Sequence, residues 1–267
     1  MVHPIEQLRY VARASGADSG LLVQEAASAL GVFSHDPAGL VTAARRLLTR
    51  QPAIGPLWWM CSRLATGVDI WADARDVIEA LRNDRTEREL AHALPDGATV
   101  VIIGWPDIIV AALPRRGDLR VLVVDIEGQA SPVVRRLDRA EVEVEEIDPA
   151  RIAGAVQAAD VVLIEAAAAG PAAALGDVGS LTVAATAKAS GTPTWLVAGV
   201  GRRLPEQYWQ AIVERTVARE EIPWLAAFEV VAFGLIDRVV TSDGLQLPGE
   251  LPPTDVPFAS ELLRELS

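Results

Sequence analysis

A change of hydrophobic period at Pro95-Asp96-Gly97 divides this sequence into two parts that favour different secondary structure. Before this turn signal, apolar residues recur at the spacing of one helix face. After it, short runs rich in β-branched residues alternate with helical stretches. Because helices and strands have side-chain periods of 3.6 and 2 residues, the sequence predicts a helical part followed by an α/β part.

Six helices are expected in the first part, from apolar spacing and capping residues. They cover Ile5–Val11, Leu21–Leu30, Pro37–Leu47, Ile54–Leu64, Ile70–Leu81 and a segment that ends near Leu94. The third has the clearest start, because Asp36 is a favoured N-cap and Pro37 a favoured first helical residue. No strand is expected before the turn signal.

Seven strands are expected in the second part, most of them separated by helical stretches. They cover Val100–Ile103, Leu119–Val124, the region of Val142 and Val144, Val161–Ile164, Thr194–Ala198, Phe228–Val231 and Arg238–Thr241. Short, continuous apolar strands that alternate with helices are typical of a parallel sheet covered on both faces. The expected architecture is therefore a helical N-terminal domain, residues 1–95, followed by a Rossmann-like α/β domain with a largely parallel sheet, residues 96–267.

The net charge of −12 argues against nucleic acid as a direct partner, because an acidic chain repels the phosphate backbone unless it carries a basic patch. The basic doublets are scattered and have no aromatic residues between them, so we interpret them as solvated arginines at helix ends. They are Arg45-Arg46, Arg115-Arg116, Arg135-Arg136 and Arg202-Arg203.

Other signals for cofactors, metals and membranes are weak. Cys61 is the only cysteine, so no intramolecular disulfide is expected, and we interpret it as a core residue. The three histidines lack metal-ligand spacing. The segment Val197–Gly201 lacks the third glycine and the acidic residue of a dinucleotide loop, so it predicts a turn, and no cofactor is expected. The N-terminus shows no long apolar run, so neither a signal peptide nor a membrane span is expected, and the expected compartment is the cytoplasm.

Four ordered segments of the chain carry a pattern found in a known family. They are Pro95–Val100, Ala159–Ile164, Gly179–Pro193 and Phe228–Gly244. Their order and spacing resemble the translation initiation factor 2B alpha, beta and delta regulatory subunits. That family includes methylthioribose-1-phosphate isomerase and ribose-1,5-bisphosphate isomerase, and this chain looks like a diverged member over about residues 40–245. The resemblance implies a homodimer formed through the α/β domain.

The resemblance also shows which residues the isomerase reaction would need, and most are absent here. The isomerases have a cysteine after the first sheet strand, where this chain has Gly104-Trp105-Pro106. Their catalytic aspartate falls on Ala166, next to Glu165, and their Asn-Lys pair falls on Gly176-Asp177. Their two arginine positions fall on Gln51, beside Arg50, and in Glu127-Gly128-Gln129. This concerted loss predicts a non-catalytic protein.

The same positions are the candidate ligand site, in the cleft between the two domains at the carboxyl edge of the sheet. They are Arg50, Gln51, Gly104, Trp105, Gln129 and Gly176. We expect Trp105 either to plug the cleft or to stack on a ligand, and a phosphorylated small metabolite is the ligand that the resemblance implies. Two alternatives stay open. One is an aldose–ketose isomerase acting on a phosphorylated sugar, with Glu165 and Asp177 as weak catalytic candidates. The other is a purely structural dimer.

Overall fold

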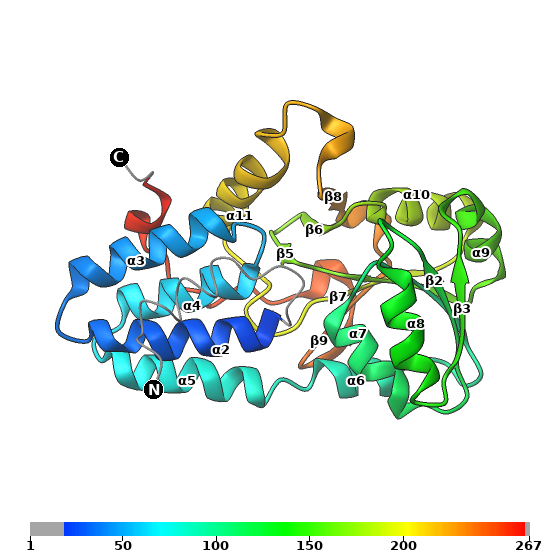
Figure 1. The fold of residues 1–267 in the computed structure, drawn as a ribbon, viewed down its shortest axis with the longest axis horizontal. Coiled ribbons are helices and arrows are strands. Elements are labelled where there is room, and N and C mark those ends of the chain that lie inside the picture. The colour runs from blue at the N-terminus through cyan, green and yellow to red at the C-terminus, as the bar shows by residue number, and fades with distance from the viewer. Residues whose placement is uncertain (1–18, 265–267) are drawn as a thin grey trace.

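The computed structural model describes residues 19–264 and places a group of helices beside a twisted sheet, as Figure 1 shows. The helices of the first part are α2 (Ser19–Leu30), α3 (Pro37–Arg50), α4 (Gly55–Thr66), α5 (Ile70–Arg82) and α6 (Thr86–Ala93). They confirm every helix expected from residue 19 onwards. The helix expected at Ile5–Val11 lies outside the described residues. Within those residues, no strand precedes β1 (Thr99–Ile103).

Capping side chains explain where two of these helices begin. The carboxylate of Asp36 accepts a hydrogen bond from the backbone N–H of Gly39 at 2.9 Å, and Pro37 follows it as the first residue of α3. The carboxylate of Asp69 accepts from the N–H groups of Trp71 and Ala72, each at 3.1 Å, at the start of α5. Local sequence therefore sets these helix starts.

The main sheet has seven strands in the order β10-β9-β7-β4-β1-β2-β3. Their bounds are β1 (Thr99–Ile103), β2 (Arg120–Val124), β3 (Glu143–Ile147), β4 (Val161–Glu165), β7 (Thr194–Val197), β9 (Arg238–Thr241) and β10 (Gly244–Gln246). All neighbours are parallel except β10, which pairs antiparallel with β9. The edge position of β3 explains its valine–glutamate alternation, because its glutamates lie exposed.

Helices cover the sheet on both faces, as a largely parallel sheet requires. They are α7 (Asp107–Ala112), α8 (Ala130–Asp138), α9 (Ile152–Ala158) and α10 (Ser180–Ser190). Each face of the sheet has its own apolar core: one includes Val100 and Ile102, and the other includes Val101 and Ile103. The expected α/β class with preceding helices is confirmed.

One strand does not join the sheet in which it was expected. The segment Phe228–Ala232 forms β8, which pairs antiparallel with β6 (Ala173–Asp177) in a separate three-stranded sheet that also contains β5 (Ala168–Ala169). The alanine-rich segment Ala166–Ala174, which supplies β5 and the start of β6, gave no strand signal because alanine is depleted in strands. A β-branched run predicts that a strand forms, but not which strand it pairs with.

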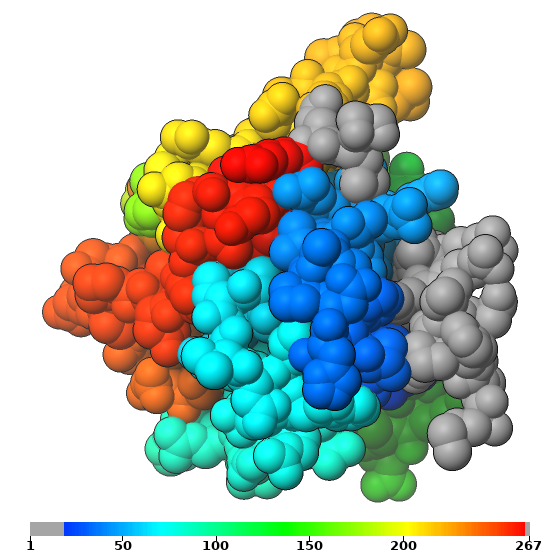
Figure 2. All heavy atoms as spheres, turned by 90° about the vertical axis from the view of Figure 1, so that its left-hand side faces the viewer, coloured from blue at the N-terminus to red at the C-terminus, as the bar shows by residue number. Residues whose placement is uncertain are grey.

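The core of the helical part draws in residues from the far end of the sequence. It includes Tyr208 of α11 (Glu206–Val213) and Leu262 near the C-terminus, both fully buried. The Tyr208 hydroxyl accepts a hydrogen bond from the N–H of Ala259 at 2.7 Å and lies 3.0 Å from the hydroxyl of Ser62. Figure 2 shows the last described residues beside the helices of the first part. A division into domains at residue 95 therefore stays a proposal.

Across residues 19–264, none of the helices combines the length and the apolar character needed to cross a membrane.

Candidate functional site

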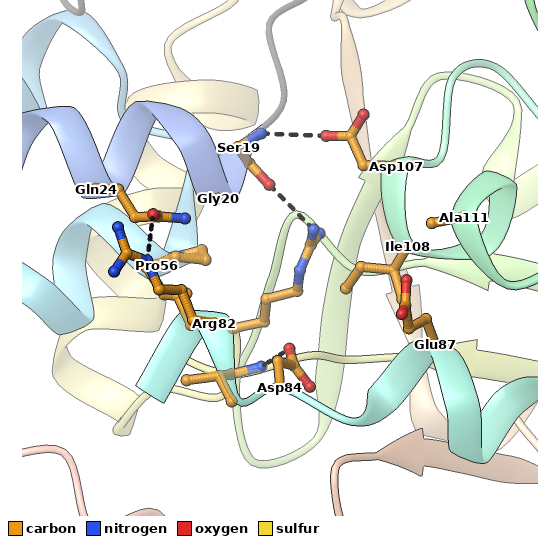
Figure 3. A pocket seen from close by; sticks show the side chains of 13 residues that line it. Ser19, Gly20, Gln24, Pro56, Arg82, Asp84, Glu87, Asp107, Ile108 and Ala111 are labelled. Atoms are coloured by element: carbon orange, nitrogen blue, oxygen red, sulfur yellow. Dashed lines mark hydrogen bonds between the residues drawn. The ribbon is translucent and has the colours of Figure 1, made fainter. Parts of the chain in front are cut away.

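Two adjoining cavities lie where the carboxyl ends of β1 and β4 meet the helices of the first part. The larger, of about 280 Å³, is shown in Figure 3, and the smaller has about 120 Å³. Both are lined by Ser19, Asp107 and Arg202. Ligands of open α/β sheets bind in crevices at the carboxyl ends of the strands, so this is the candidate site.

Glu165, the last residue of β4, has a partner for each carboxylate oxygen. Its Oε1 lies 2.8 Å from Nη2 of Arg202, and the two side chains are only 9% and 7% exposed. Its Oε2 accepts hydrogen bonds from the N–H groups of Ile108 at 2.8 Å and Ile109 at 3.1 Å, in the first turn of α7. The unpaired N–H groups at a helix start favour an anion, so Glu165 is stabilised as an internal counter-ion.

Arg202 joins the two parts of the molecule through its other N–H groups. Nη1 donates to the carbonyl of Ala166, and Nη2 donates to the hydroxyl of Ser19 at 3.1 Å, as the close-up in Figure 3 shows for Ser19. The interpretation of Arg202 as a solvated arginine is wrong, because the residue is 6% exposed. A buried charge needs a partner of opposite charge, and the carboxylate of Glu165 is the partner of Arg202.

The turn before Arg202 is the one expected at Val197–Gly201. Gly201 has a φ of 77°, and a Cβ there would approach a ring atom of Trp59 to 2.8 Å. A residue with a side chain would be strained in this conformation and crowded by the indole. Glycine therefore lets the loop after β7 pass close to α4 and direct Arg202 into the site.

Asp107 lines both cavities, and Trp105 lines the smaller one. The Trp105 indole N–H donates to Oδ1 of Asp107 at 2.9 Å, and the N–H of Ser19 donates to Oδ2 at 3.1 Å. Trp105 also packs against the core on one face of the sheet. The residue thus packs against the protein and lines the smaller cavity at once, and stacking on a ligand stays a prediction.

Asp177, the last residue of β6, also lines the smaller cavity. No described residue donates a hydrogen bond to its side chain. Burial raises its pKa to about 6, opposed by the charge of Arg202 and assisted by that of Asp107. Burial likewise raises the pKa of Glu165 to about 7, again opposed by Arg202 and assisted by Asp107. The site thus holds two carboxyl groups whose pKa values lie near neutrality.

The remaining sequence candidates fall at different distances from these cavities. A Cβ on Gly104 would lie 3.1 Å from Oδ2 of Asp177 and 3.4 Å from Oε1 of Gln129, so these three residues lie together. Gly176 is a close-packing position, because a Cβ there would lie 2.6 Å from the hydroxyl oxygen of Ser180. Arg50 is exposed at the end of α3 and Gln51 follows it. Neither lines the two cavities, and their ligand-binding role stays a prediction.

Comparison with known proteins gives structural matches alone. No protein-family profile and no curated protein sequence matches the chain. The Pyrococcus horikoshii translation initiation factor eIF-2B matches with a TM-score of 0.77 and 13% identity, over 95% of this chain and 98% of that one. The P. horikoshii 5-methylthioribose 1-phosphate isomerase matches with a TM-score of 0.65 and 15% identity, over 92% and 84%. This chain has the initiation factor 2B fold.

A third match in this fold comes from an assembly. It is the tetrameric eIF2B-beta2-delta2 complex from Chaetomium thermophilum, with a TM-score of 0.69 and 16% identity over 92% of this chain and 90% of that one. The structural matches bear out the likeness that the sequence segments suggested. At identities of 13–16%, they establish the fold and leave the chemistry to the site itself.

Three of the positions that the sequence resemblance singled out lie together at the smaller cavity. Trp105, Glu165 and Asp177 line it, and Ala166 is fully buried behind Glu165. Cys61 is far from this role, because it is fully buried in α4, where burial strongly raises the pKa of its thiol. Its interpretation as a core residue is confirmed.

Sequence reasoning missed Ser19, Asp107 and Arg202 as residues of the site. Asp107 stood in the segment that follows the first strand, and its place just before an apolar helical run was an available signal. For Arg202 the available signal was its position, directly after the turn glycine Gly201 that follows an expected strand. Ser19 had no signal, because its role depends on contacts with residues more than 80 positions away.

Proposed function

We propose that this protein is a non-catalytic member of the initiation factor 2B fold that binds a small metabolite in the cleft between its helices and its sheet. The observation that carries the proposal is the engagement of Glu165. Both of its carboxylate oxygens already have partners, in Arg202 and the first turn of α7. A general base needs a lone pair aimed at a substrate proton, and three of the roughly four lone-pair positions of the Glu165 carboxylate already face Arg202 or a backbone N–H group.

The charges of the smaller cavity also disfavour the isomerase substrate. Among the described residues that line it, Asp107, Glu165 and Asp177 carry carboxylates and Arg202 is the one cation. Two like unit charges 4 Å apart repel by about 1 kcal/mol in water and about 4 kcal/mol near a protein surface. A phosphorylated sugar would therefore meet net repulsion at the position where the resemblance calls for a lysine.

One observation favours the isomerase alternative. Glu165 and Asp177 line the same cavity with pKa values of about 7 and about 6. A pair of carboxyl groups with different pKa values near neutrality is the arrangement that moves a proton between adjacent carbons. This function requires Glu165 to leave Arg202 when a substrate binds.

An activity assay separates the two functions. We expect no ketose formation from methylthioribose-1-phosphate by the purified protein. Turnover that Glu165→Gln abolishes, and that the exposed-strand control Glu145→Gln retains, would overturn the non-catalytic proposal. Turnover that is the same in both variants would show that Glu165 is not the base, and the isomerase mechanism based on it would fail.

A further inference from the structure

In the smaller cavity, the carboxylate of Asp177 is available to accept hydrogen bonds, whereas the cation of Arg202 already has partners within the protein. The Arg202 guanidinium forms an ion pair with Glu165 and donates hydrogen bonds to Ala166 and Ser19. The Asp177 carboxylate receives no hydrogen bond from any residue between 19 and 264, although the residue lies half-buried. A half-buried carboxylate without donors is costly, so a ligand that donates to it would be stabilised.

The walls of this cavity suit a small cationic group. Ile54, Trp105 and Pro106 supply an apolar and aromatic lining around the carboxylates. Electrostatic attraction is stronger where water is partly excluded, and the face of an indole attracts cations. The volume of about 120 Å³ limits the occupant to a small group, and the adjoining cavity of about 280 Å³ has room for the rest of a ligand.

The charged side chains that line the larger cavity have partners within the protein, and its described neutral polar side chains are those of Ser19 and Gln24. Asp84, for example, accepts hydrogen bonds from the N–H and hydroxyl of Thr86 and from the N–H of Val200. Figure 3 shows the hydrogen bond that Arg82 donates to Gln24, on the side of the cavity opposite Asp107. The polar groups of the larger cavity therefore suit the hydroxyls of a ligand better than a second charged group on it.

We infer that the cleft selects a small organic amine, with its ammonium group against Asp177 and Trp105 and its polar body in the larger cavity. This inference rests on the proposed binding function and names its ligand class. A small organic amine is opposite in charge to the phosphorylated metabolite that the sequence resemblance implied. The difference follows from the carboxylate at residue 177 and from the engagement of Arg202 within the protein.

Titration calorimetry with matched probes tests the ligand class. Glucosamine, glucose and glucose 6-phosphate present the same ring with a positive, neutral or negative substituent, and ethanolamine with ethylene glycol forms a second matched pair. We expect the amines to bind more tightly than their matched alcohols and the phosphate not to bind. Asp177→Asn should weaken amine binding about tenfold to 100-fold, because a hydrogen bond between charged groups is lost. The exposed control Asp138→Asn should leave binding unchanged.

The outcomes separate this inference from the proposed function. Binding of glucose 6-phosphate without the amines would overturn the ligand class and leave cleft binding intact. Binding of no probe at all would count against both. Amine binding that Asp177→Asn leaves unchanged would place the ammonium group elsewhere and overturn the site. The wild-type measurements decide the charge preference even if the variant fails to fold.

Discussion

Replacing Arg202 by methionine is expected to destabilise the protein by about 3–5 kcal/mol at pH 8. Methionine keeps much of the side-chain length and removes the charge. The change leaves the buried carboxylate of Glu165 with two backbone N–H partners and no cation, and it removes donors to Ala166 and Ser19. Breaking a buried pair by removing one partner costs this much because the other charge stays desolvated.

The destabilisation should depend on pH. Burial already raises the pKa of Glu165 to about 7, and loss of Arg202 removes the largest opposing influence. At pH 5 the carboxyl group is therefore protonated in the variant, and the unpaired charge disappears. We expect the cost at pH 5 to be well below the cost at pH 8.

Urea unfolding followed by tryptophan fluorescence measures both quantities. With a slope of about 3 kcal/mol per M, the midpoint should fall by about 1 to 1.7 M at pH 8. The matched control is Arg120→Met, because Arg120 pairs with Glu143 and Glu145 on the surface with half of its side chain exposed. Such pairs contribute about 0–1 kcal/mol. Equal losses for the two variants, or equal losses for Arg202→Met at both pH values, would refute the reasoning.

Three further predictions concern pH, assembly and the C-terminal segment. Because the folded-state pKa values of Glu165 and Asp177 lie above their ordinary values of 4.5 and 3.8, the folded state binds more protons, and stability should fall by about 3 kcal/mol per group as pH rises from about 4 to 7. Urea midpoints across this range measure the fall, and a double variant with both carboxyls made amides should lose that slope. Trp224 is 83% exposed and precedes the edge strand β8 by four residues, so we expect a homodimer of the 28.4 kDa chain by light scattering. Trp224→Ser should shift it towards the monomer, and a wild-type monomer at micromolar concentration would contradict the prediction. Tyr208→Phe should destabilise the protein by about 1–3 kcal/mol in thermal or urea unfolding, because the buried N–H of Ala259 loses its acceptor; an unchanged midpoint would contradict this.

Local sequence determined the elements of this protein and the point at which its architecture changes. The turn at Pro95-Asp96-Gly97 separates α6 from β1, and the pair Asp36-Pro37 starts α3 as expected. The alternation of valine and glutamate around Val144 correctly indicated a strand with a wet face. Caps, turns and side-chain periods act between residues a few positions apart, so the sequence displays them directly.

The tertiary structure alone decided the partners of these elements and the electrostatics of the site. Which sheet β8 joins depends on β6, a segment about fifty residues earlier whose alanines carry little strand signal. Whether Arg202 is solvated or buried depends on Glu165 and on Ser19, which lies 183 residues away in the sequence. The sequence placed Glu165 just after an expected strand and gave no strand signal at Asp177. The low-dielectric cavity that raises the pKa values of both residues exists only when the helices and the sheet are packed together.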